Sequence, residues 1–317
     1  MAALSLPTRE DADLLFSVIV PTHRRPAELR RCLEALAALD VPPASYEVIV
    51  VNDGGSDDAA RCVAAVAAAT DRQLRSVSQP QSGPARARNT GASEARGRFL
   101  AFTDDDCAPR ADWLNRLVER LDSHPSAIVG GRSVNACVTL PCSAASQLLI
   151  DFLYTYHRRG DTSVGFFATN NMAVEARAFR ESGGFDVSFP LAAGEDREFC
   201  ERWRCRGGAL VYADDALVEH AHRLTLGRFV RQHFNYGRGA EFLRRSRARR
   251  HESDCRPPAE PWGFHLRLVA FPLRQTRGWR GLTLCLLMLI SQATYVAGYL
   301  FQRVFRVNKP LSRPAAA

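Results

Sequence analysis

The sequence lacks the two glycine patterns with which many nucleotide-binding proteins hold phosphates. No G-x-G-x-x-G follows the first expected strand, and no G-x-x-x-x-G-K-[ST] occurs anywhere in the 317 residues. In both patterns the glycines allow the backbone to approach a phosphate closely. Their absence removes the main support for a dinucleotide-dependent oxidoreductase or a P-loop NTPase.

The sequence also lacks a disulfide framework, a zinc pattern and a secretory signal. Its nine cysteines are scattered, form no C-x-x-C pair and have no histidines at metal-ligand spacing. Such cysteines are typical of a reducing compartment. Acidic residues precede the apolar run 14–20, which is too short for a signal peptide. We therefore expect the catalytic part of the chain in the cytoplasm.

Acidic residues are missing from 281–317, and the net charge of +8 is unevenly distributed. Residues 1–222 carry 24 arginines and 30 acidic residues, whereas 223–280 carry 14 arginines and four acidic residues. The basic C-terminal third is expected to meet an anionic partner. The arginine-rich stretch 244–250 has no interleaved aromatic residues and stands beside an apolar segment, so we do not expect a nucleic-acid partner.

Short β-branched runs alternate with helical patterns in the first half of the chain. FSVIVPT (16–22) and YEVIVVND (46–53) are the clearest, and they are typical of strands buried on both faces. The alternation implies right-handed βαβ units and predicts an α/β fold with a doubly wound, mostly parallel sheet. Further strands are expected at 75–79, 98–103 and 127–133, with helices at 26–39, 57–69, 84–95 and 113–121.

The second half of the chain is less regular. Its apolar pattern predicts a helix over 146–156 and a strand followed by a helix start over 167–179. A further helix is expected over 195–208, where two glycines end it, and two short strands over 209–220.

Polar residues stand at the ends of three expected strands. They are Thr22, the pair Asn52 and Asp53, and the run Asp104 to Asp106. Ligands bind beyond the carboxyl ends of the strands in such sheets, so we expect these side chains to converge. Adjacent aspartates repel one another, and a hard divalent cation held with substrate phosphates would neutralise them. We predict that Asp106 binds such a cation with a diphosphate; a solvated turn is the alternative.

Six motifs follow one another between residues 16 and 222. They are SVIVPTHRR, VIVVNDGGSDD, GPARARNTGASEARGRFLAFTDDDCAP, NNMAV, GGFD and GEDREF. This series resembles that of the family 2 glycosyltransferases, which have the Rossmann-like GT-A fold. The resemblance implies transfer of a sugar from a nucleoside diphosphate sugar to a hydroxyl acceptor, with inversion at the anomeric carbon. It also implies Mg²⁺ or Mn²⁺ as cofactor.

The resemblance gives donor-side roles to the first motifs. Thr22 and Asp53 match positions that contact the nucleoside. Arg88 matches the start of the family's helix, where an arginine can offset diphosphate charge. A solvated helix face is the alternative for Arg88. The chain departs from the family pattern at Asn52, where a second acid is common, and in the extra glycine that follows Asp53.

The triple aspartate matches the family's DxD signature. Asp104 would lie nearer the ribose while contributing to the metal site, and Asp106 would be the metal ligand. Asp105, the middle residue, would help to position the donor. His220 in VEHAH is expected as a further metal ligand, with an ordinary surface histidine as the alternative. Because His222 stands two positions later on the strand, we expect the two rings on opposite faces.

The GEDREF motif supplies the predicted catalytic acids. An inverting displacement needs a base that removes the proton of the acceptor hydroxyl, and Asp196 is the predicted base, with Glu195 the next candidate. Without the resemblance, Asp196 would be explained as an acid favoured by a helix N-terminus. Asn170 and Asn171 are expected on the acceptor side; buried amides bonded to loop backbone are the alternative.

The C-terminal segment 281–302 carries no charge over 22 residues. At ~1.5 Å per residue it is long enough to cross a ~30 Å hydrocarbon layer, and it could also lie in the interface or pack as a buried helix. Basic residues on both sides do not orient it. The predicted organisation is a tail (1–14), a GT-A domain (15–222), a basic helical region (223–280), an apolar helix (281–304) and a second tail (305–317).

These observations predict a hexosyltransferase-type, inverting glycosyltransferase on the cytoplasmic side of the membrane, held peripherally or by a single C-terminal span. Its acceptor would be a glycan or a lipid-linked molecule in cell-envelope polysaccharide assembly. Two alternatives remain open at this point. A metal-dependent nucleotidyltransferase would release pyrophosphate, and a nucleotide-sugar-binding protein would show no turnover.

Overall fold

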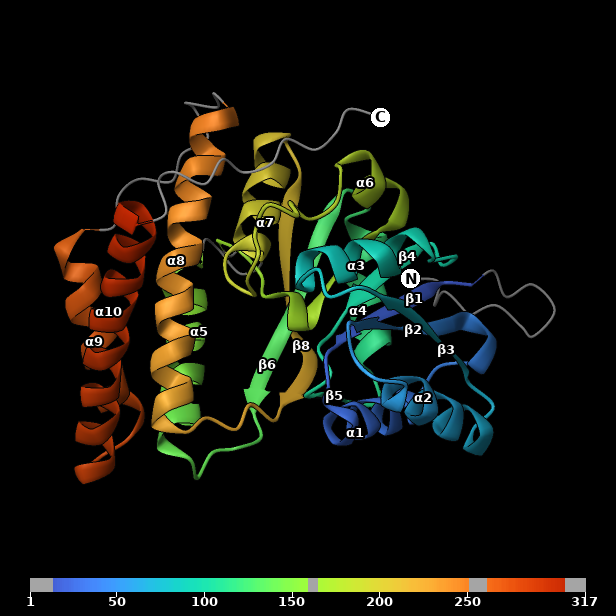
Figure 1. Ribbon diagram of the computed structural model, residues 1–317, viewed down its shortest axis with the longest axis horizontal. Helices are drawn as coiled ribbons and strands as arrows, with labels where there is room; N and C mark the ends of the chain where they lie inside the picture. The colour runs from blue at the N-terminus through green and yellow to red at the C-terminus, as the bar shows by residue number, and fades with distance from the viewer. Residues whose placement is uncertain (1–13, 159–164, 251–260, 306–317) are drawn as a thin grey trace.

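One mixed sheet lies at the centre of the described residues that precede the C-terminal helices. The computed structural model describes residues 14–158, 165–250 and 261–305. Its eight strands have the order β3-β2-β1-β4-β7-β6-β8-β5, and only β7 and β5 run against their neighbours (Figure 1). The strands are β1 (Phe16–Thr22), β2 (Tyr46–Asp53), β3 (Gln73–Gln79), β4 (Phe99–Phe102), β5 (Cys107–Pro109), β6 (Ala127–Asn135), β7 (Met172–Glu175) and β8 (Ala209–His220). The predicted doubly wound, mostly parallel α/β sheet is confirmed.

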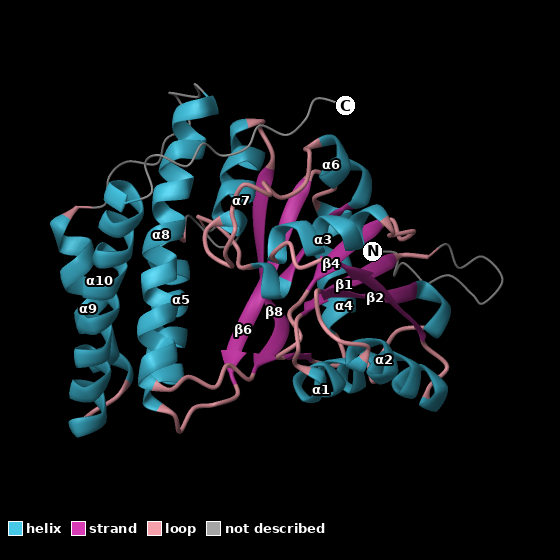
Figure 2. Ribbon diagram, in the orientation of Figure 1, coloured by secondary structure: helices cyan, strands magenta, loops and turns pink. Residues whose placement is uncertain are grey.

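Helices cover both faces of this sheet (Figure 2). On one face, α1, α2 and α4 bury a mainly aliphatic core against β1 and β2, which includes Leu33 and Val63 together with Trp113. On the other, α3, α6 and α7 bury aromatic residues against β4, including Phe179 and Phe199. The helices of the first 205 residues are α1 (Pro26–Ala37), α2 (Asp58–Ala69), α3 (Pro84–Ser93), α4 (Trp113–Ser123), α5 (Pro141–His157), α6 (Ala176–Glu181) and α7 (Glu195–Cys205), with two short 3-10 turns, η1 (Pro43–Ser45) and η2 (Thr169–Asn171).

Two expectations for the strands differ from the structure. The predicted pair of short strands over 209–220 is wrong, because β8 is one strand whose pairing with β6 shifts register between Gly131 and Arg132. Gly131 faces Ala213 while Arg132 faces Leu217, so the polar residues between them interrupt the ladder without ending the strand. The three-residue β5 was not expected; it directly follows the triple aspartate and pairs with the end of β8.

Three long helices form the C-terminal part. They are α8 (Leu226–Arg250), α9 (Trp262–Gln275) and α10 (Trp279–Phe305). Helices α5 and α8 stand beside the sheet, and α9 and α10 form the outermost layer beyond them (Figure 1). Helix α8 thus lies between the sheet and the apolar helix α10.

Candidate active site

The triple aspartate forms the turn between β4 and β5, and its three members have different surroundings. Asp105 is fully buried. It accepts a hydrogen bond of 2.7 Å from the Thr22 hydroxyl at the end of β1, and it is ion-paired with Arg25. Burial raises the pKa of Asp105 to about 7, although Arg25 and Thr22 favour its charged form. Thr22 and Asp105 therefore fix the turn, and their side chains face each other.

Asp106 is the member of the turn that meets a histidine. Its Oδ1 lies 3.2 Å from His220 Nε2, and its Oδ2 accepts a hydrogen bond of 2.9 Å from Arg25. Burial opposes ionisation, but the hydrogen bond and charge of His220, together with Arg25, outweigh it and hold the pKa of Asp106 well below its usual range. Asp106, His220 and the neighbouring Cys107 place possible ligand atoms within 4.8 Å of one another. Among the described residues, this group could hold a metal ion, and it includes two of the predicted ligands, Asp106 and His220.

The expectation for the two histidines of VEHAH is wrong. His220 and His222 stack, with ring centroids 5.0 Å apart and planes inclined by 24°. Alternation holds only within a strand, and β8 ends at His220. Burial and the neighbouring His220 lower the pKa of His222 to about 4.

The end of β2 binds the backbone of the next loop. Asp53 is buried and accepts hydrogen bonds from the amides of Ser82 (2.7 Å) and Gly83 (2.9 Å) and from the Gln79 side chain. These bonds hold the loop that starts α3. Asn52, the departure from the family pattern, bonds to Ser56 O and to the amide of Gly55. The extra glycine is therefore part of a closed turn.

Arg88 joins the two acidic motifs. It lies in the second turn of α3 and its side chain is 4% exposed. One guanidinium nitrogen donates to Asp104 at 2.8 Å and another donates to Glu195 at 3.1 Å. Arg88 is therefore not part of a solvated helix face, whereas Arg86 on the same helix is exposed. The DxD turn and the first residue of α7 thus share one cation.

Glu195 and Asp196 open helix α7. Glu195 is buried, and burial, together with the charge of Asp196, raises its pKa to about 7 despite Arg88. Burial also raises the pKa of Asp196, whose carboxylate accepts a bond from the amide of Arg197 at 2.7 Å. Asp196 is less buried than Glu195. It is therefore the more accessible of the two acids to a molecule arriving from outside.

Asn170 and Asn171 lie in η2, between α5 and β7. Asn171 accepts a bond from the Trp113 indole at 2.9 Å and donates to Ala216 O at 2.9 Å. Asn170 accepts from Ser133, and its backbone oxygen accepts from Thr103. Both amides are engaged inside the protein, and their role toward an acceptor stays a prediction.

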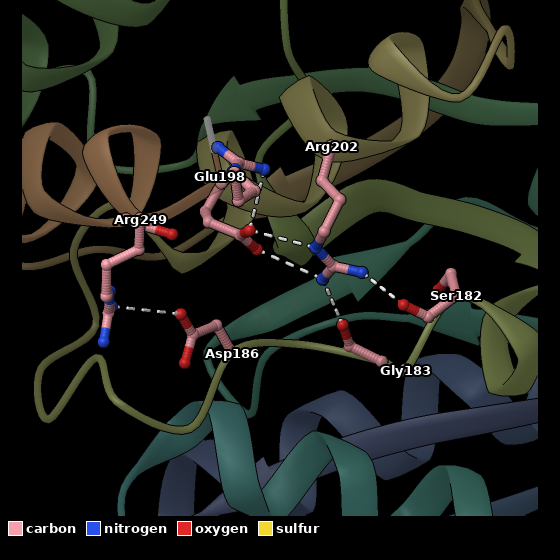
Figure 3. Close-up of a pocket in the computed structure, with 9 residues that line it drawn as sticks. Ser182, Gly183, Asp186, Glu198, Arg202 and Arg249 are labelled. Atoms are coloured by element: carbon pink, nitrogen blue, oxygen red, sulfur yellow. Dashed lines mark hydrogen bonds and ion pairs between the residues drawn. The ribbon is translucent and has the colours of Figure 1, made fainter. Parts of the chain in front are cut away.

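A cavity of 360 Å³ lies on another side of α7, and none of the predicted site residues lines it. Glu198 in its wall binds Arg202 at 2.9 Å and Arg250 at 3.0 Å, and Arg249 points toward Asp186 (Figure 3). Arg247 adds a pair to Glu201 at 2.7 Å. These contacts are structural: they fasten the end of α8 to α7 and to the GGFD turn.

Helix α8 also touches the backbone just before Glu195 and Asp196. A Cβ added to Gly239 would overlap the carbonyl oxygen of Ala193, and one added to Gly194 would lie 3.2 Å from Gly239 O. Only glycine allows two backbones to approach so closely. Gly239 therefore sets the path of the chain into Glu195 and Asp196.

Comparisons with known proteins identify the family of this chain. The sequence model of Glycosyl transferase family 2 matches residues 17–183, and that of Glycosyl transferase family group 2 matches 104–303. The chain belongs to glycosyl transferase family 2. It is 29% identical to glycosyltransferase AglE of Haloferax volcanii, over 70% of this chain and 72% of that protein. It is 31% identical to the pre-mycofactocin glycosyltransferase of Mycobacterium tuberculosis, over 71% of this chain and 46% of that protein.

Solved structures share the fold of this family 2 glycosyltransferase. The mannosyltransferase PcManGT of Pyrobaculum calidifontis, solved with GDP-Man and Mn²⁺, has a TM-score of 0.60 at 19% identity, over 93% of this chain and 81% of that chain. GalNAc-T7, solved with UDP, GalNAc and Mn²⁺, has a TM-score of 0.55 at 15% identity, over 82% of this chain and 56% of that chain. The predicted GT-A fold is confirmed.

The sequence pattern gave no role to two residues that shape the candidate site. Arg25 belongs to the first motif, and in the structure it pairs with both Asp105 and Asp106. Gly239 lies beyond the predicted catalytic domain 15–222. An arginine next to the start of α1 is a weak signal for the first, and nothing in the local pattern indicates the second.

We expect Gly239→Ala to lower kcat about 10- to 100-fold, because a small displacement of a catalytic group is costly. Donor affinity should stay unchanged, since the added methyl group meets Ala193 and not the DxD turn. Gly227→Ala is the matched control, because a Cβ there meets nothing within 4 Å on the same helix. Steady-state kinetics together with donor titration separate the two effects, and equal kinetics for both variants would contradict this role.

Proposed function

We propose that this glycosyltransferase moves a sugar from a nucleoside diphosphate sugar to a hydroxyl acceptor with inversion, using Mg²⁺ or Mn²⁺. The observation that carries the proposal is the Arg88 bridge, because it places the DxD turn and the Glu195–Asp196 pair on one rim. A donor held at the turn would therefore present its anomeric carbon toward the helix that carries the base. This arrangement suits a direct displacement.

The residues at the DxD turn fit a divalent metal. Asp106 and His220 approach each other at 3.2 Å, and Asp104 stands two positions away on the same turn. Carboxylate and imidazole donors suit Mn²⁺, and carboxylates with phosphate oxygens suit Mg²⁺. When bound, the cation would neutralise the diphosphate and stabilise it as a leaving group. Asp106 and His220 would hold it, with Asp104 contributing from the ribose side.

The chain's own groups divide the remaining work. Thr22 and Asp53 stand at the ends of β1 and β2, where the nucleoside would lie, and Arg88 would offset charge near the diphosphate. Asp196 would take the acceptor's proton as the acceptor oxygen bonds to the anomeric carbon and the bond to the diphosphate breaks. Its raised pKa brings the carboxylate closer to the basicity that a general base needs.

The names of relatives support a carbohydrate role without fixing the donor. Two neighbours were solved with different nucleotide sugars, GDP-Man in PcManGT and UDP-GlcNAc in TarS of S. aureus. A further relative, 28% identical over 69% of this chain, is the succinoglycan biosynthesis protein ExoM of Rhizobium meliloti. We propose a glycan or lipid-linked acceptor in cell-envelope polysaccharide assembly.

We also propose that the enzyme works at the cytoplasmic side of the membrane. Among the described residues, α10 is the helix that is long and apolar enough to cross a bilayer, and most of its apolar stretch is not buried inside the protein. The basic residues around it favour anionic headgroups. An acceptor held in the same membrane would then lie within reach of the site.

Replacement of the proposed metal ligand should remove metal-dependent donor binding. We expect Asp106→Asn to weaken donor affinity in the presence of Mn²⁺ by more than about tenfold, as losses of metal-site groups do. Asp71→Asn, at an exposed carboxylate, is the control. Calorimetric titration of both variants with and without a chelator measures the effect. If the chelator leaves the donor affinity of the parent unchanged, Asp106 does not have this role.

Replacement of the proposed base should spare donor binding and remove turnover. We expect Asp196→Asn to lower kcat about 10²–10⁴-fold at near-parental donor affinity. Burial raises the pKa of Asp196. As the pH is lowered, the parent's kcat/KM should therefore fall with a midpoint above about 3.9, the ordinary pKa of an aspartate. The base must be ionised to act, so activity is lost below its raised pKa. Residual transfer near the parental rate would move the role to another group.

A further inference from the structure

The two helices of the outer layer expose many apolar side chains. Six aliphatic residues of α10 are at least half exposed and recur every three, four or seven positions. At 3.6 residues per turn they fall within an arc of about 80° and extend over about 33 Å. Helix α9 adds two exposed leucines. The α9–α10 face consists of Leu266, Leu273, Leu282, Leu286, Leu289, Val296, Leu300 and Val304.

The opposite side of α10 packs against the rest of the protein. Leu284, Met288 and Ser291 are buried, and Gln302 accepts a hydrogen bond of 3.0 Å from Arg238 of α8. The helices also meet backbone to backbone. A Cβ on Gly298 would overlap the carbonyl oxygen of Phe234, and one on Gly237 would overlap that of Tyr295.

The charge around the α9–α10 face has one sign. Its two helices and the turn between them carry five arginines and no acidic residue, and the last acidic residue of the sequence is Glu260. Exposed arginines lie at both ends of α10, and Trp279 at its start is 86% exposed. Tryptophan and arginine beside an apolar stripe are typical of helices at a lipid–water interface. The arginines are Arg267, Arg274, Arg277, Arg280 and Arg303.

We propose that the α9–α10 face binds an anionic bilayer with α10 lying in the plane of the membrane. The apolar stripe would enter the acyl boundary, and the flanking arginines would meet the headgroups. The inference rests on the membrane association proposed above. It adds the binding surface, the charge of the lipid and the orientation of the helix.

Spanning is incompatible with the packing of α10. Helix α8 lies along it and carries Arg238 and Arg245, both bonded to Gln302. A spanning α10 would take these charges into the hydrocarbon layer or leave α8 behind, exposing Ser291 and Gln302 to lipid. Helix α8 cannot follow without leaving the catalytic domain, because Arg247 is paired with Glu201. Lying flat keeps every one of these contacts.

A second copy of the chain is a poorer occupant of the face. The stripe has the spacing of a coiled-coil seam, so self-association is the natural rival. Each copy would bring five arginines and no acidic partner to such a seam, and like charges there repel. Anionic lipid supplies the missing negative charge.

Flotation of the full chain with vesicles tests the face. We expect binding to vesicles of phosphatidylcholine and phosphatidylglycerol, with much weaker binding to phosphatidylcholine alone. Leu289→Glu should weaken binding by about tenfold or more, because it removes apolar burial and adds a negative charge. Val187→Glu is the matched control, since Val187 is exposed to a similar degree away from α9 and α10. Equal vesicle binding by the two variants would overturn the proposal. It would also be overturned if the parent protein does not bind vesicles and instead forms a dimer that Leu289→Glu converts to a monomer.

Hydrogen exchange on the vesicle-bound protein tests the orientation. Amides of α8 around Phe234 and Gly237 should keep their protection when vesicles are added, because α10 stays packed on them. Increased exchange there would show that α10 has left α8 to span, and would overturn the flat orientation. Donor titration of Leu289→Glu separates this inference from the proposed function. Parental donor affinity with lost vesicle binding isolates the membrane surface, whereas a parent that binds vesicles but no nucleotide sugar would overturn only the proposed function.

Discussion

The site depends on one buried cation with two anionic partners. Arg88 reaches Asp104 in the DxD turn and Glu195 at the start of α7, two segments about 90 residues apart in sequence. Without it, Glu195 would lose this counterion, and removing one partner of a buried ion pair typically costs about 3–5 kcal/mol. The bridge therefore links the fold's stability to the placement of the donor turn and of the base.

The three aspartates of the turn have identical side chains but different contacts, and these contacts distinguish their expected roles. Asp104 is held by Arg88, Asp105 by Thr22 and Arg25, and Asp106 by Arg25 and His220. Only Asp106 lies beside an imidazole that is itself a potential ligand. The repulsion between three adjacent carboxylates is thus relieved by two arginines, since Arg88 pairs with Asp104 and Arg25 pairs with both Asp105 and Asp106.

The sequence alone was sufficient to predict those features of the fold and site that depend on local residue patterns or on hydrophobic periodicity. Apolar runs at 16–22 and 46–53 predicted buried strands, and the polar residues after them were correctly expected at one rim. Contacts set by tertiary packing could not be predicted. Gly239 meets Ala193 because α8 folds back across α7, and the histidine rings stack because the chain leaves the strand after His220.

Urea unfolding of a double-mutant cycle at Arg88 and Glu195 tests most directly whether this bridge holds the site together. Four proteins are compared: the parent, Arg88→Met, Glu195→Gln and the double variant. If the guanidinium neutralises the buried carboxylate, Arg88→Met should be strongly destabilised, and adding Glu195→Gln should restore part of the loss, since contacting residues are not additive. Losses in the free energy of unfolding that simply add would contradict the account.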